Sequence, residues 1–277
     1  MIAAAVLAFR EGLEAALILG IVLSVLRRLG RADRSWSVWL GAGLAALISL
    51  IAGAALHGLG VAFEGQAEQI FEGVAMLLAA AVLTWMIFWM ARQGRAAHMA
   101  LERDVRRAAQ GGSSWALFSL AFVAVLREGI ELALFLTAAA FTTTSQVTLV
   151  GGLLGLGAAA VAGWALFATA GRLDVRAFFR VTGILLILFA AGLVGHSVHE
   201  LNEAGWIPAV IEQVWNVNPV LNEGSTVGQL LKALLGYNGN PSLTEVVAYA
   251  GYYAVIFMAL GHARSRAEGV PASMEAV

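Results

Sequence analysis

Long apolar stretches separated by short polar segments run along most of the chain. A helix needs about 20 residues to cross the hydrocarbon core of a bilayer, and charged residues are rare within these stretches. The pattern therefore predicts an all-α, polytopic membrane protein with about seven transmembrane helices. Their expected ranges are 2–26, 36–59, 64–91, 115–141, 147–171, 178–200 and 244–262.

The composition agrees with a membrane protein and limits the chemistry of any site. Of 277 residues, 60% are hydrophobic and only 13% are charged, whereas soluble domains carry roughly 25% charged residues. The chain has no cysteine, so neither a disulfide framework nor a thiolate metal site can form. A bound metal would have to be held by oxygen or imidazole ligands. We expect the lipid bilayer as a partner, and no nucleic acid.

Basic residues are distributed unevenly between the expected connections. Of 17 lysines and arginines, most lie in the first, third and fifth connections and in the C-terminal tail, whereas the even-numbered connections hold only Lys232. Cytoplasmic connections are enriched in Lys and Arg, so we expect the N-terminus outside and the C-terminus in the cytoplasm. Six or eight spans would break this alternation. The expected location is the cell (cytoplasmic or inner) membrane.

An internal repeat organises the chain as a single transmembrane domain over 1–277. One charged motif occurs in the first and fourth spans, and 71–73 in the third span aligns loosely with 181–183 in the sixth. Because a unit of three spans is odd, the second repeat must be inverted, and inverted repeats place a substrate site near the midplane where they meet. The parts are repeat 1 at about 1–91, a cytoplasmic loop at 92–114, repeat 2 at about 115–200, an external loop at 201–243 and the seventh helix at 244–262.

The charged motif is the first candidate site. It reads Arg10-Glu11-Gly12-Leu13-Glu14 and Arg127-Glu128-Gly129-Ile130-Glu131, each inside an apolar stretch. A charged side chain at mid-helix costs about 2.5 to 3.5 kcal/mol on insertion scales, so these charges must face protein, water or a ligand. Glutamates three residues apart project from one helix face, and both pairs fall in the central third of the bilayer.

Carboxylate oxygens are the ligands that hard, highly charged cations prefer. When all are ionised, the two arginines and four glutamates leave a deficit of positive charge that a divalent or trivalent cation would largely compensate. The alternative is that each arginine pairs with its glutamate as a buried lock between helices. That alternative explains neither the second carboxylate nor the duplication.

Two further groups could handle a cation at the outer side. Glu64, Glu68 and Glu72 recur every four residues at the start of the third span and would form an acidic stripe. At the outer end of the sixth span, His196 and His199 share a helix face and, with Glu200 and Glu203, could capture a metal. The alternatives are a solvated helix start for the first group, and interfacial polar residues capping a helix end for the second.

The motifs together resemble the iron permeases of the oxidase-dependent iron transporter family. The resemblance rests on the paired Arg-Glu-Gly phrases, Phe71-Glu72-Gly73, the segment 199–206, Leu235-Gly236-Tyr237-Asn238, and Pro241-Ser242 with Glu245. It implies a seven-span permease that imports iron after external oxidation from ferrous to ferric. Iron would be the transported substrate, with no permanent cofactor, and an extracytoplasmic iron-oxidising or iron-delivering protein would be a partner. Metal would be handled by Glu11, Glu14, Glu128 and Glu131, with Arg10 and Arg127 as charge partners.

The sequence leaves two alternatives to iron import. A transporter for another metal cation, such as lead or manganese, fits the same motifs. An intramembrane metalloenzyme fits less well, because the chain has neither a His-Glu-x-x-His nor a Glu-x-x-His sequence. We therefore expect no catalytic residues. Small-residue helix faces allow a homo-oligomer without requiring one.

Overall fold

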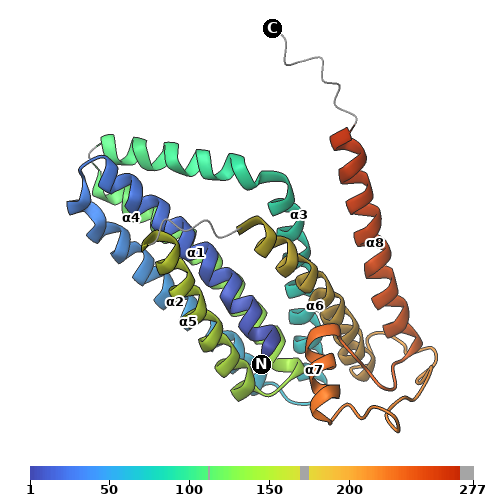
Figure 1. Ribbon diagram of the computed structural model, residues 1–277. Helices are drawn as coiled ribbons and strands as arrows, with labels where there is room; N and C mark the ends of the chain where they lie inside the picture. Colours follow the sequence, from blue (N-terminus) through green and yellow to red (C-terminus); the bar gives the residue numbers. More distant parts are fainter. Residues whose placement is uncertain (112, 169–174, 269–277) are drawn as a thin grey trace.

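The computed structural model of the chain describes residues 1–111, 113–168 and 175–268, and these residues contain no β-strand. The helices form one bundle, with α7 beside one end of it (Figure 1). The elements are α1 (Ile2–Arg28), the 3₁₀ turn η1 (Ala32–Arg34), α2 (Ser35–Ala62), α3 (Gln66–Gln110), α4 (Ser114–Thr142), α5 (Ser145–Ala168), α6 (Val175–Glu203), α7 (Thr226–Leu235) and α8 (Leu243–Glu268).

Length and apolar composition identify five candidate membrane spans in the described part of the chain. They are Ala32–Ala62, Gln66–Trp89, Ser145–Leu166, Val181–Glu203 and Leu243–His262. Helices α1 and α4 are long enough, at 27 and 29 residues, but each carries the charged motif near its centre. The regular elements of the described residues are thus all helical, and five apolar helices of spanning length agree with a multi-pass membrane protein. Seven spans, the inverted repeat and the orientation stay predictions.

The third connection differs from the expected loop. Residues 92–110 of the expected cytoplasmic loop at 92–114 are helical and continue α3. Figure 1 shows that α3 bends, so its last part runs across one end of the bundle. There Val105 and Ala109 are buried with Leu26 and Leu117, because apolar residues four positions apart share one face of this otherwise charged segment.

The long helices pack in three main pairs. Helix α1 packs chiefly against α5, α2 against α4, and α3 against α6. If α1–α3 are taken as one half of the chain and α4–α6 as the other, the first helix of each half contacts the second helix of the other half. A buried cluster that includes Leu7, Met76, Phe135 and Leu186 joins α1, α3, α4 and α6. Helix α8 packs on α6, and α7 also contacts α6.

Glycines allow two of these helix pairs to approach closely. A methyl group on Gly155 of α5 would collide with the carbonyl oxygen of Ala5 and lie 2.8 Å from the amide nitrogen of Phe9 in α1. In the other pair, a methyl group on Gly41 of α2 would collide with the carbonyl oxygen of Phe118 in α4. Small residues thus bring the backbones of α1 and α5, and of α2 and α4, into contact.

We expect Gly155→Ala to lower the free energy of unfolding by about 1–3 kcal/mol, because the added methyl group overpacks the interface between α1 and α5. The matched control is Gly157→Ala on the same helix, where a methyl group meets nothing within 4 Å. Detergent-driven unfolding in mixed micelles measures both. Equal stability of the two variants would show that this contact does not constrain the bundle.

Candidate metal site

The two copies of the charged motif meet inside the bundle. Helices α1 and α4 contact each other and run in opposite directions (Figure 1). Ligand atoms of Glu11, Glu128 and Glu131 all lie within 4.8 Å of one another, and the three residues are buried. Within residues 1–111, 113–168 and 175–268, no other group of three or more such side chains is that compact.

The arginine of the first motif is enclosed. Arg10 is 1% exposed, and its two terminal nitrogens divide between two carboxylates. Nη1 donates to Glu11 Oε1 at 2.6 Å, and Nη2 lies 2.8 Å from Glu14 Oε1. Nη1 also donates to Met86 Sδ at 3.0 Å, which ties α1 to α3. Glu14 is thus held by Arg10 and lies outside the compact group of three.

The arginine of the second motif has a more open environment. Arg127 Nε donates to Glu131 Oε1 at 2.9 Å and lies 3.9 Å from Glu128 Oε1. Its side chain is 33% exposed, and its guanidinium carbon lies 4.4 Å from the ring centre of Trp89 and 5.8 Å from that of Trp85. Both tryptophans come from α3, so the guanidinium of Arg127 lies against aromatic rings of that helix.

Three carboxylate oxygens of the group lack partners. The Oε2 atoms of Glu11, Glu128 and Glu131 are buried and have no hydrogen bond among the described residues. Buried polar atoms are normally hydrogen-bonded, and buried charges are normally paired. The two arginines neutralise part of the negative charge only. The arrangement therefore suits a hard cation bound through oxygen ligands alone.

The motif glycines admit neighbouring helices. A methyl group on Gly12 would lie 2.9 Å from Ala159 Cβ of α5, and one on Gly129 would lie 2.6 Å from Ser49 Cβ of α2. Each glycine thus lets the second helix of the other half approach the charged centre.

The acidic residues at the start of α3 face the end of α6. Glu64 is exposed in the connection before α3, Glu68 is exposed in the first helical turn, and Glu72 is half-buried. Glu64 therefore does not continue the helical spacing. The carboxylates of Glu68 and Glu72 lie close enough to Glu200 to repel it. Gln69 Nε2 donates to Glu203 Oε2 at 2.9 Å and fixes the two helix ends together.

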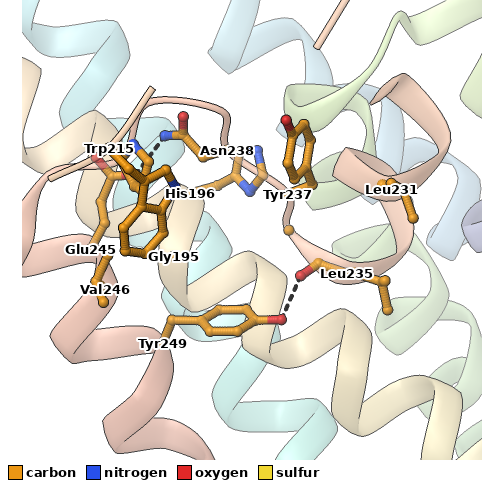
Figure 2. A pocket seen from close by; sticks show the side chains of 12 residues that line it. Gly195, His196, Trp215, Leu231, Leu235, Tyr237, Asn238, Glu245, Val246 and Tyr249 are labelled. Atoms are coloured by element: carbon orange, nitrogen blue, oxygen red, sulfur yellow. Dashed lines mark hydrogen bonds between the residues drawn. The ribbon is translucent and has the colours of Figure 1, made fainter. Parts of the chain in front are cut away.

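The histidines near the end of α6 do not form one ligand set with Glu200. The Nδ1 atom of His199 lies 3.0 Å from Glu245 Oε1, and its Nε2 lies 3.3 Å from Glu203 Oε1. His196 instead lines a separate cavity with Glu245 (Figure 2). Of the four residues expected to capture a metal, the structure therefore brings His199 and Glu203 together, whereas His196 lines the cavity.

Several residues around these sites were not assigned a role from the sequence. Glu245 clamps α8 to α6 through His199, and Trp85, Trp89 and Met86 surround the arginines. The only local signals are an acidic residue in the first turn of α8 and two tryptophans four positions apart, which share a helix face.

Comparison with known proteins places the chain in a family. Residues 1–265 match the model of the iron permease FTR1 family. The chain is 36% identical over 245 residues to the ferrous iron permease EfeU of Escherichia coli O6:K15:H31 (strain 536). The matched region covers 88% of this chain and 89% of that protein. The chain is also 32% identical over 246 residues to EfeU of Yersinia pestis, covering 88% and 87%. No solved structure matches the chain. The protein therefore belongs to the FTR1 iron permease family.

Proposed function

We propose that this iron transporter imports iron across the cell membrane through a site built from Glu11, Glu128 and Glu131, with Glu14 beside it. Membership of a permease family makes the protein a transporter rather than an enzyme. The observation that supports the site best is the buried group of three carboxylates contributed by both motif copies. Their unpartnered oxygens are the feature that a bound cation would complete.

The charge balance supports a multivalent cation. Four glutamates and two arginines carry a net charge of −2 when all are ionised. A divalent cation would neutralise this charge, and a trivalent cation would leave one positive charge. A monovalent cation would leave buried negative charge uncompensated, which is costly in a low-dielectric interior.

The packing of each motif helix on a helix from the other half of the chain supports a transport mechanism based on an inverted repeat. Helix α1 packs on α5 and α4 packs on α2, so the two motif helices occupy equivalent places in the two halves. Inverted repeats carry a site at their interface and expose it alternately by rocking one half against the other. We infer that iron enters past Glu68, Glu72 and Glu200, which lie together at the ends of α3 and α6.

Iron is proposed to cross in the ferric state. The all-oxygen ligand group favours the harder of the two common iron ions. The EfeU relatives are named ferrous iron permeases, which fits ferrous iron as the external supply. One electron must then be removed from each ion outside the membrane, and we assign that step to an extracytoplasmic iron-oxidising partner.

The two arginines have different proposed roles. Arg10 is buried and bridges two carboxylates, so it holds the first motif in place. Arg127 is partly exposed and rests on Trp89, so it can leave Glu131 when a cation binds there and remain over the aromatic ring. The aromatic ring would lower the free energy of the displaced guanidinium.

We expect Glu131→Gln to reduce iron uptake by at least about tenfold, because the amide removes a negative ligand while keeping the side-chain shape. The measurement is uptake of radiolabelled iron by vesicles that contain the purified chain. Glu102→Gln is the matched control, because Glu102 is exposed on the last part of α3. Wild-type uptake by Glu131→Gln would contradict the proposed site.

The same vesicles compare the transported ions. A ferric chelate should support uptake, and ferrous iron kept reduced without oxygen should not. Manganese should not replace iron. Uptake of reduced ferrous iron at the ferric rate would contradict the proposed oxidation state while leaving the carboxylate site intact, and uptake of manganese would favour the broader metal transporter.

The different roles of the two arginines predict that the same substitution mainly affects stability at Arg10 and mainly affects iron uptake at Arg127. Arg10→Lys should lower the free energy of unfolding by about 3 kcal/mol, because an ammonium group cannot bridge Glu11 and Glu14 as the guanidinium does. Arg127→Lys should cost about 1 kcal/mol of stability and mainly slow iron uptake. Detergent-driven unfolding and vesicle uptake measure the two quantities. A larger loss of stability in Arg127→Lys would reverse the assignment.

A further inference from the structure

A cavity of about 400 Å³ lies where α6, α7 and α8 meet, apart from the carboxylate group (Figure 2). Its walls are mainly apolar and aromatic, and they include Trp215, Leu235, Tyr237, Val246 and Tyr249. Binding sites for small molecules typically occupy about 300 to 1,000 Å³ and combine apolar walls with a few polar atoms. The cavity has the size and lining of such a site.

One polar atom in the wall has no partner. His196 is only 8% exposed, and its Nδ1 lies 3.0 Å from the carbonyl oxygen of Gly192. A carbonyl oxygen only accepts, so Nδ1 must carry the hydrogen, and the neutral ring leaves a lone pair on Nε2. That Nε2 atom is buried and makes no hydrogen bond within the described residues. Figure 2 shows the His196 ring beside Asn238 and Tyr237.

Three other polar side chains of the wall are occupied. Asn238 Nδ2 donates to Glu245 Oε2 at 2.7 Å, and Tyr249 Oη donates to the carbonyl oxygen of Leu235 at 2.8 Å. Tyr237 Oη donates to the carbonyl oxygen of Leu221 at 2.7 Å. A ligand therefore needs to supply one hydrogen-bond donor, to His196, and apolar surface elsewhere. The carboxylate of Glu245 disfavours an anion, and one imidazole in an apolar wall is too few ligands for a metal ion.

We propose that this cavity binds a small uncharged molecule with a hydroxylated aromatic ring, whose O–H donates to His196 Nε2. The ring would lie against Trp215, Tyr249 and the leucine side chains of α7. The proposal goes beyond iron transport and does not depend on the carboxylate site. Such a ligand could come from water or from the bilayer, and both sources offer the same chemistry.

Two matched ligands test the hydrogen bond in the unmodified protein. The full chain in lipid nanodiscs is titrated with 4-methylphenol and with 4-methylanisole, which has the same ring but no donor. Saturation-transfer NMR measures binding, and empty nanodiscs supply the background of partition into lipid. We expect saturable binding of 4-methylphenol that is about fivefold tighter than that of 4-methylanisole.

A pair of variants tests the residue. His196→Phe should weaken binding of 4-methylphenol about fivefold and remove the difference between the two ligands. His262→Phe, on an exposed position of α8, should change neither. Equal binding of the two ligands by the wild-type chain would overturn the proposal, even if His196→Phe did not fold. A folded His196→Phe variant that still bound 4-methylphenol more tightly than 4-methylanisole would also overturn it.

Whether the ligand comes from water or from the bilayer is tested by supplying the phenol in either phase. In one arm 4-methylphenol is added in water, and in the other 4-dodecylphenol is incorporated in the nanodisc lipid and competes with it. Displacement of 4-methylphenol by the lipid-borne phenol assigns the ligand to the bilayer. Saturable 4-methylphenol binding without such displacement assigns it to the aqueous phase, and absence of saturable binding in both arms overturns the proposal.

Discussion

The structure holds the six charged side chains of the two motifs, two arginines and four glutamates, inside a helix bundle. Each would cost about 2.5 to 3.5 kcal/mol at the centre of an isolated membrane helix. Arg10 and Arg127 offset part of this cost through contacts of 2.6 to 2.9 Å with glutamates of their own motifs. The pairing remains incomplete, because buried oxygens of three glutamates have no partner. This shortage of positive charge supports our proposal that the group binds and releases a cation.

The helices around this site are arranged to shield it from lipid. Gly12 lets α5 approach α1, and Gly129 lets α2 approach α4, so each motif is covered by a helix from the other half. The two halves are nevertheless unequal at the arginines. Arg10 is enclosed next to Met86, whereas Arg127 rests on Trp89 and is partly exposed. This difference in burial and contacts is the basis for the different roles that we propose for the two arginines.

Hydrophobic periodicity predicted the all-helical architecture, and the repeated motif predicted which glutamates come together inside the bundle. The compact group of Glu11, Glu128 and Glu131 follows from mid-helix charges that must face the interior. Periodicity could not show that Glu14 is held by Arg10, because side-chain rotamers decide that contact. It also missed the helical extension of α3, where Val105 and Ala109 lie on the buried face. The contact of His199 with Glu245, and the cavity that His196 lines, depend on the long connection to α8, whose path leaves no periodic signal.

The most direct test is the position of iron in the protein. Crystals of the purified chain soaked with ferric iron would be measured on both sides of the iron absorption edge, and the anomalous difference density would locate the ion. We expect a peak in contact with carboxylates of both α1 and α4, among Glu11, Glu128 and Glu131. A peak only at the end of α6, beside His199 and Glu203, with none between the two motif helices, would contradict the central carboxylate site.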